Sequence, residues 1–263
     1  MELLYKYYSN DNKYAIPNLK DGQISFSPVE ALNDPFEGVG AYSFQVSEDE
    51  KSYWDSIGTN VPELLSKRFS DEVRALANFK YRIFCSTEEY DNPLMWAHYA
   101  NSHKGFCVGY SKADILKLAD EAQKINYSDE MQSINDCDEK IFSSLLFQKS
   151  TSWGEENEFR AIYKLKKEDI SVSNPDVYFS HSEFETKPKL YFLDGHVQTN
   201  NLKCLSADKY ILKKCKPAVI YLGMRMGWND KKEIIDLAHK NEITVYQMIQ
   251  QQNCFQFTRK RII

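Results

Sequence analysis

Short runs in which apolar and polar residues alternate recur along the chain and predict β-strands. An opening strand is expected around residues 4–9. The other predicted strands cover residues 23–26, 81–86, 105–110, 158–164, 189–193, 218–222, 244–248 and 254–258. The pattern therefore favours a sheet built from many short strands.

One strongly amphipathic helix is expected after Asn92, which suits a helix cap, and Pro93, which suits the first helical position. Gly105 stands where a C-terminal glycine would end that helix. The residues predicted to share one of its faces are Trp96, Tyr99, Ala100 and His103. Such a face is either plain core or the wall of a pocket.

Other helical patterns lie between the predicted strands. Serine-led capping patterns at residues 27–30 and 111–114 predict helices that begin there, the second with an apolar period through Ala122. Residues 128–149 form a longer polar stretch of helical character, and a helix over 230–240 lies between two predicted strands.

Strands and helices are mixed rather than strictly alternating, which favours an α+β class with a mixed, mainly antiparallel sheet flanked by helices. Neither a repeat nor a Gly/Ser-rich linker divides the chain, so residues 1–263 are predicted to form a single domain.

Composition narrows the class of protein. Hydrophobic residues make up 42% and charged residues 27%, which is typical of a soluble globular protein. The net charge of −5 gives no global attraction to nucleic acid or to anionic membrane. The sequence shows no signal peptide and no apolar run long enough to span a bilayer, and its cysteines are scattered. We expect a cytoplasmic protein with reduced thiols and no membrane partner.

The first candidate site is the acidic segment around the strand at 158–164. Alternation puts Glu156, Glu158 and Arg160 on one side if this segment is extended, with Phe159 on the other. Arg160 would then hold one carboxylate ionised while the other engages a ligand. The alternative interpretation is a solvated strand face with cross-strand ion pairs.

Two further segments allow both a structural and a functional interpretation. The Asn-Asp-Pro turn at 33–35 either stops a helix or fixes Asp34 or Glu37 at the mouth of a pocket. Lys6, between tyrosines on the opening strand, either binds a phosphate beside a stacked base or keeps an edge strand soluble.

A metal site is not expected. His98 and His103 are five residues apart, whereas a zinc pair on a helix needs a spacing of four. Either histidine remains a candidate general base.

Several pieces of the chain, taken in order, resemble the domain-of-unknown-function 2971 family of bacterial proteins. They are LYKYYS at 4–9, FSPVEALNDPFEG at 26–38, FCST at 84–87 and PLMWAHYANSHKGFCVGY at 93–110, followed by the spaced residues Lys149, Trp153, Glu156, Glu158 and Arg160. The family name implies no activity.

A second set of residues resembles the NAD-dependent ADP-ribosyltransferases. These enzymes carry a polar or basic residue on an early strand, a small hydroxyl residue on a middle strand, and a late catalytic Glu, often preceded two positions earlier by Glu or Gln. Lys6, then Ser86 or Thr87, and then the pair Glu156 and Glu158 follow that order. The resemblance implies an ADP-ribosyltransferase-like fold and NAD as substrate, with Glu158 stabilising an oxocarbenium-like cation.

The same resemblance assigns the remaining candidate residues. Lys6 or Arg160 would meet the diphosphate, and Tyr7, Trp96 or Tyr99 would stack a ring. His98 and His103 are included among the residues expected to bind the dinucleotide.

Three functions stay open at this point. The first is an ADP-ribosyltransferase-like enzyme acting on a protein or nucleic-acid acceptor, as in a bacterial toxin or phage-defence effector. The second is a metal-independent nuclease with His98 or His103 as general base, and the third is a non-enzymatic nucleotide-sensing or interaction module.

Overall fold

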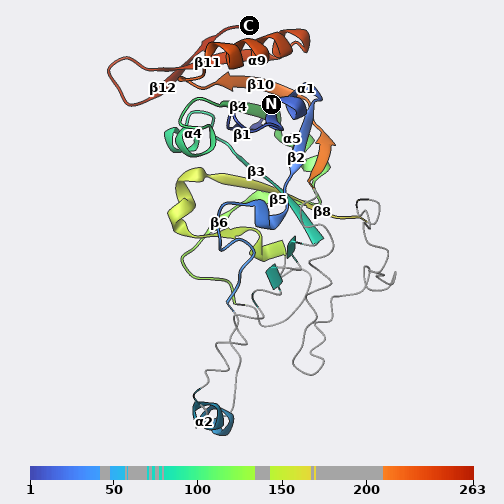
Figure 1. Ribbon diagram of the computed structural model, residues 1–263, viewed down its shortest axis with the longest axis vertical. Helices are drawn as coiled ribbons and strands as arrows, with labels where there is room; N and C mark the ends of the chain where they lie inside the picture. Colours follow the sequence, from blue (N-terminus) through green and yellow to red (C-terminus); the bar gives the residue numbers. More distant parts are fainter. Residues whose placement is uncertain are drawn as a thin grey trace.

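The architecture comes from a computed structural model, which describes residues 1–41, 48–56, 58, 70, 73–74, 77–78, 80–133, 143–166, 169 and 210–263 (Figure 1). The strands are β1 Leu3–Tyr8, β2 Gln23–Phe26, β3 Tyr81–Thr87, β4 Phe106–Ser111, β5 Glu121–Lys124, β6 Asn126–Tyr127, β7 Gln148–Lys149, β8 Glu158–Lys164, β9 Ile211–Lys214, β10 Pro217–Leu222, β11 Thr244–Gln250 and β12 Phe257–Arg261. The helices are α1 Ala15–Lys20, α2 Glu48–Ser56, α4 Pro93–Tyr99, α5 Lys112–Leu118 and α9 Trp228–Lys240, with 3₁₀ turns η1 Val29–Ala31 and η2 Thr151–Glu156.

Eight of the twelve described strands build one sheet in the order β12-β11-β10-β4-β1-β3-β8-β5, and the other four form the separate pairs β2-β9 and β6-β7. Neighbouring strands of the eight-stranded sheet are antiparallel except for β10 and β11, which are parallel and joined through α9. The predicted α+β class with a mainly antiparallel sheet is therefore confirmed, as is the strand-helix-strand succession near the C-terminus. None of the helices described is long and apolar enough to cross a membrane.

The sheet opens between β1 and β3. β1 pairs with β4 along its whole length, from Leu3 to Tyr8, but pairs with β3 only between Tyr5 and Thr87. Farther along β3, Ile83 instead exchanges backbone hydrogen bonds with Ser27. Because β1 and β3 diverge, their backbone N–H and C=O groups cannot hydrogen-bond to each other there, and a hollow forms between the two strands.

Strand β8 alternates as its sequence predicts. Phe159, Ala161 and Tyr163 pack into the main hydrophobic core. Ile162 points to the opposite face, where it packs against Tyr81. The segment before β8 differs from the prediction, because Glu156 ends the 3₁₀ turn η2 and Asn157 adopts a left-handed conformation before the strand begins.

The helix after Asn92 is shorter than predicted. Asn92 caps it as expected, accepting hydrogen bonds from the amides of Leu94 and Met95, but the helix ends at Tyr99. Three consecutive left-handed residues, at positions 101–103, then reverse the chain with φ values of +45°, +52° and +68°. Such a run is rare, because each left-handed non-glycine residue costs about 1 kcal/mol or more. The predicted shared helical face through His103 is therefore wrong.

Gly105 has a different role from the predicted helix terminator. A Cβ atom there would lie 2.0 Å from the carbonyl oxygen of Tyr8. Glycine is required because the chain after the left-handed turn passes directly against β1.

Three further predictions are corrected. Residues 27–30 lack the expected side-chain cap and form only η1, since Ser27 pairs with β3 instead. The helix capped by Ser111 ends at Leu118, and Ala122 lies in β5, which pairs with β8. The predicted strand at 254–258 begins later, because residues 251–256 form the turn that leads into β12.

Among the described residues, the predicted helical stretch over 128–149 is confirmed only at 143–145 and is wrong at both of its ends. Residues 128–133 are irregular, and Tyr127 pairs with Lys149 in a parallel β6–β7 bridge. Residues 134–142 and the predicted strand at 189–193 lie outside the described residues.

Candidate functional site

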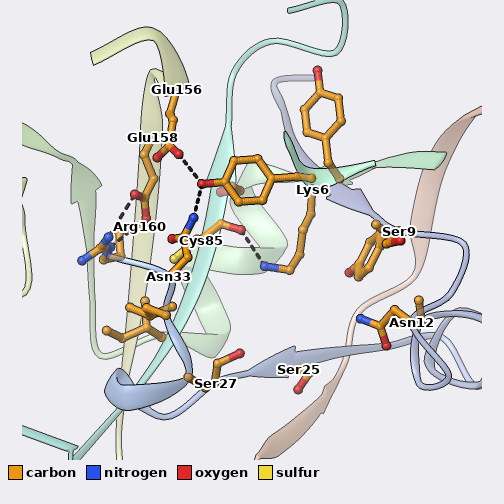
Figure 2. A pocket seen from close by; sticks show the side chains of 18 of the residues that line it. Lys6, Ser9, Asn12, Ser25, Ser27, Asn33, Cys85, Glu156, Glu158 and Arg160 are labelled. Carbon is orange, nitrogen blue, oxygen red and sulfur yellow. Dashed lines mark hydrogen bonds and ion pairs between the residues drawn. The ribbon is translucent and has the colours of Figure 1, made fainter. Parts of the chain in front are cut away.

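A cavity of about 740 Å³ occupies the opening between β1 and β3 (Figure 2). This volume falls within the range of about 300–1,000 Å³ that is usual for small-molecule sites. The charged residues among its described lining are Lys6, Glu37, Lys149, Glu156, Glu158 and Arg160.

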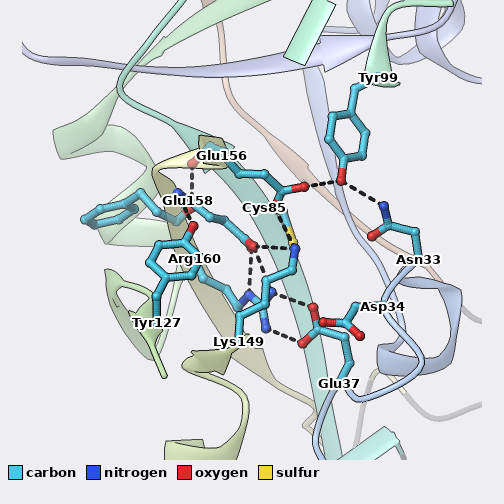
Figure 3. A network of polar contacts seen from close by, with 12 residues as sticks. Asn33, Asp34, Glu37, Cys85, Tyr99, Tyr127, Lys149, Glu156, Glu158 and Arg160 are labelled. Carbon is cyan, nitrogen blue, oxygen red and sulfur yellow. Dashed lines mark hydrogen bonds and ion pairs between the residues drawn. The ribbon is translucent and has the colours of Figure 1, made fainter. Parts of the chain in front are cut away.

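Arg160 is the centre of a buried polar network (Figure 3). Its Nε and Nη2 donate to Glu158 at 2.7 and 2.9 Å, and its Nη1 and Nη2 donate to Glu37 at 2.7 and 2.8 Å. Nη1 also donates to the carbonyl oxygen of Leu146 at 2.6 Å. A guanidinium has five N–H groups, and each of them is engaged. Arg160 therefore positions the two carboxylates and has no donor left for a ligand diphosphate, contrary to one of the sequence expectations.

Glu158 is kept ionised by its neighbours. Burial opposes its charge, but Arg160 and Lys149 outweigh burial and lower the pKa of Glu158 to about 2. The Cys85 thiol also donates a hydrogen bond to this carboxylate. Glu158 is therefore a buried anion at neutral pH, and it lies in the wall of the cavity.

Lys149 joins the two glutamates of the acidic segment. Its Nζ lies 2.6 Å from Glu156 and 3.4 Å from Glu158, and 4.5 Å above the ring of Trp153. Although burial opposes the charge, the two carboxylates raise the pKa of Lys149 above its usual value. The network thus contains three carboxylates, on Glu37, Glu156 and Glu158, and two cations.

The acidic segment and helix α4 meet at Tyr99. Its hydroxyl donates to Glu156 and accepts from the amide of Asn33 at 2.8 Å. Burial raises the pKa of Tyr99, so the phenol stays protonated. The two segments therefore converge on one hollow beside the N-terminal strand.

The Asn-Asp-Pro turn carries Glu37 into this network. The Asp34 carboxylate accepts from the amide of Phe36 at 2.9 Å, which fixes the turn locally. Glu37 is 1% exposed, and burial raises its pKa even though Arg160 opposes that shift. The turn therefore places the Glu37 carboxylate against the guanidinium of Arg160, which is 123 residues later in the sequence.

Lys6 is the cation of the opposite wall. Its Nζ donates to the Cys85 carbonyl at 2.9 Å and lies 4.7 Å above the Phe84 ring. Burial lowers the pKa of Lys6. Within the part of the chain that the structure describes, no carboxylate forms an ion pair with Lys6. An ammonium group whose only hydrogen-bond acceptor among the described residues is a carbonyl is suited to a ligand anion.

Most of the residues selected from the sequence line this cavity. Those that do are Lys6, Tyr7, Ser86, His98, Tyr99, Glu156, Glu158 and Arg160. The Ser86 hydroxyl is already used, since it donates to the carbonyl of Phe159 at 2.8 Å. His98 lies in an exposed position at the rim.

Trp96 and His103 do not line the cavity. Trp96 is 1% exposed, packs edge-on against Tyr7 at 5.2 Å, and donates from Nε1 to the carbonyl of Tyr90. His103 stacks on Trp96 at 6.4 Å and against Phe257 at 5.5 Å. Trp96 belongs to an aromatic cluster built around Tyr7, Trp96 and Tyr221, and Tyr7 also lines the cavity. His103 lies on the turn beyond the helix, which ends at Tyr99.

Sequence reasoning did not assign roles in this site to Lys149 or Cys85. Lys149 appeared only as one of the spaced family residues, and Cys85 only within an apolar strand. The Asn-Asp-Pro turn suggested Glu37 as a residue at the mouth of a pocket, but its position in the sequence could not identify Arg160 as its partner. Among the residues described, no group of three or more His, Cys, Asp or Glu side chains is arranged to hold a metal ion.

The fold and the site define an α+β protein with a charged cavity at an opening in its central sheet. Residues 95–161 match the family model described as "Protein of unknown function (DUF2971)", which confirms the resemblance to that family. The matched segment contains Tyr99, Lys149, Glu156, Glu158 and Arg160, whereas Lys6 and Glu37 lie before it. Neither the curated proteins nor the solved structures give a significant match.

Proposed function

We propose that the protein cleaves the nicotinamide–ribose bond of NAD and transfers the ADP-ribosyl group. The observation that carries this proposal is a buried Glu158 with a pKa of about 2 in the wall of a dinucleotide-sized cavity. In the reaction the C1′–N bond breaks and its electron pair leaves with nicotinamide. The ribosyl cation is captured by a nucleophile of the acceptor or of water, whose proton passes to solvent.

The charge of the network supports this chemistry. Three carboxylates face two cations, so one negative charge remains when all five groups are ionised. A fixed negative charge in a buried site stabilises a cation that develops on the ribose, and it does so without reorganisation of water. Glu158 is the group proposed to face that cation, with Arg160 as its positioning residue.

The opposite wall supports binding of the dinucleotide. Lys6 presents a positive charge to the cavity, which suits the diphosphate. Tyr7 and Tyr99 contribute rings to the lining and are proposed to contact the nicotinamide end. The proposal places the activity in the cytoplasm, where the cysteines stay reduced.

The test is the release of nicotinamide from NAD by the full chain. Glu158→Gln should lower the rate by about 100-fold or more, since it removes the charge that stabilises the transition state. Glu155→Gln is the matched control, because Glu155 is exposed and only three residues away. It should keep the original rate.

The Glu158 variant needs a separate readout for folding and binding. Thermal unfolding reports the fold, and titration with NADH reports binding, since the reduced ring has no cationic leaving group. A folded Glu158→Gln protein that binds NADH but releases no nicotinamide supports the proposal. Release at the original rate from that variant, or no release from the unaltered protein, overturns it.

One observation favours a second candidate, a nucleotide-binding module without turnover. All five donors of Arg160 and both cations are engaged within the protein itself, as expected of a structural brace. This candidate predicts that NAD and NADH stabilise the protein against heating while no nicotinamide appears.

A further inference from the structure

Charge is distributed unevenly along the cavity. Five of its charged lining residues, all but Lys6, belong to the network around Arg160. Figure 2 shows Lys6 between Glu158 on one side and Ser9 and Asn12 on the other. Beyond Lys6, none of the described lining residues carries a charge. We call this far part, lined by Asn12, Tyr14, Asn18, Ser25, Tyr210 and Leu212, the neutral compartment.

The neutral compartment offers hydrogen-bonding groups without partners among the described residues. Asn12 accepts through Oδ1 from the amide of Tyr14 at 3.0 Å, which leaves its side-chain NH₂ group. The side-chain amide of Asn18 and the Ser25 hydroxyl line the same space from α1 and β2, and neither makes a hydrogen bond to a described residue. Neutral donors and acceptors of this kind recognise base edges and ribose hydroxyls.

The mouth of the neutral compartment exposes apolar and ring surface. Tyr210 is 49% exposed and Leu212 47%, and Tyr14 is 62% exposed with the Lys13 ammonium 5.1 Å above one face of its ring. Large side chains left open at a cavity entrance suit the stacking of a planar ligand group. The compartment therefore combines flat faces at its entrance with uncharged polar groups inside.

We infer that the neutral compartment binds the adenosine half of the dinucleotide. This inference rests on the proposed function. With the reactive bond at Glu158 and the diphosphate at Lys6, the covalent order of the dinucleotide puts adenosine on the far side of Lys6. Adenosine is uncharged, and the compartment beyond Lys6 is uncharged as well. Asn18 and Ser25 then determine affinity for the ligand without taking part in the bond cleavage.

The probe for this site is adenosine 5′-monophosphate, titrated into the full chain by calorimetry. The unaltered protein should bind it, and Asn18→Ala should weaken binding by about five- to tenfold, as expected for one lost hydrogen bond. Asn229→Ala is the matched control, because Asn229 is an exposed helical residue outside the cavity, and it should bind normally. Nicotinamide mononucleotide, which occupies the other end, should bind Asn18→Ala as it binds the original.

Kinetics give a second readout that a merely structural role would not reproduce. Asn18→Ala should raise KM for NAD with kcat unchanged, whereas Glu158→Gln should lower kcat. If thermal unfolding shows that Asn18→Ala is destabilised, Ser25→Ala serves in its place with the same expectation.

The outcomes separate this inference from the proposed function. If the monophosphate binds and the Asn18 variant weakens it, but no nicotinamide is released, the compartment is assigned correctly and the proposed reaction is wrong. If nicotinamide is released while the Asn18 and Ser25 variants keep the original affinity and KM, the reaction stands and this assignment is overturned. Absence of monophosphate binding to the unaltered protein overturns it too.

Discussion

The acidic segment before and within β8 and the ring-rich segment after Pro93 were expected to line the same hollow, but they reach it differently. Glu156, Glu158 and Arg160 enter the cavity together. The ring-rich segment is divided, because Tyr99 lines the cavity whereas Trp96 does not, although both pack in the same aromatic cluster. A strand keeps its two-residue period over any length, whereas a helical face lasts only as long as the helix.

The two regions also differ in how they are held. Replacing one charged residue of the network leaves its buried partner without an opposite charge, which costs several kcal/mol of stability. The aromatic cluster depends on buried area and ring packing, which tolerate conservative changes better. Substitutions in each region should expose this difference.

The largest effect is expected from Arg160→Met. It leaves Glu37 and Glu158 buried without their guanidinium, and the free energy of unfolding should fall by about 3–5 kcal/mol. Urea unfolding measures the loss. Arg261→Met on the exposed strand β12 is the control and should change stability by less than about 0.5 kcal/mol. Equal stabilities for the two variants would refute the view that the network braces the fold.

The next effect is on acid stability. Because the pKa of Glu158 is about 2 in the folded protein and 4.5 in its ordinary state, its stabilisation is complete above pH 4.5 and is lost as pH falls toward 2. The loss is at most about 3 kcal/mol, and the burial-raised pKa of Glu37 offsets part of it. Urea unfolding across this pH range measures the slope.

Glu158→Gln tests the source of that slope. The variant should lose much of the decline between pH 4.5 and 2, while the exposed control Glu155→Gln should keep it. An unchanged slope in Glu158→Gln would mean that other carboxyl groups set the acid limit.

The smallest effect is expected in the aromatic cluster. Trp96→Phe loses the hydrogen bond to the Tyr90 carbonyl and part of a buried ring, so stability should fall by about 1–3 kcal/mol. Trp96 does not line the cavity but packs against Tyr7, which does, so nicotinamide release per folded molecule should fall much less than in Glu158→Gln. Trp228→Phe, at a position 73% exposed, is the stability control. A loss of activity in Trp96→Phe as large as that in Glu158→Gln would contradict the view that Trp96 acts on the site only through its packing against Tyr7.

Local patterns predicted the elements whose signal lies within a few residues. The limits of β2 and β8, the Asn92 cap and the β10-α9-β11 succession all match the sequence expectations. Each depends on strand alternation, a side chain bonding its own helix, or a helical period, which are local physical effects.

Features that depend on distant partners were not predictable in the same way. The pairing of β5 with β8 overrides the helical period that continues through Ala122. Asn101 is a residue type that commonly adopts the left-handed conformation after a helix, but the two left-handed residues that follow it, Ser102 and His103, have no such local signature. Alternation placed Glu158 and Arg160 on one face but could not show that this face is buried, because burial depends on Glu37, which is 123 residues from Arg160.

The divergence of β1 and β3 gives Lys6 two tasks at once. Its ammonium donates a hydrogen bond to the Cys85 carbonyl of β3, at a point where β1 and β3 no longer pair through their backbones. The same ammonium carries the positive charge of that cavity wall. An ammonium has three N–H groups, and among the described residues only the Cys85 carbonyl accepts from one of them, which leaves two for the anion of the proposed ligand. Ligand binding in the cavity and the contact between β1 and β3 thus both depend on the Lys6 side chain. A ligand that drew Lys6 away from the Cys85 carbonyl would weaken the contact between these two strands.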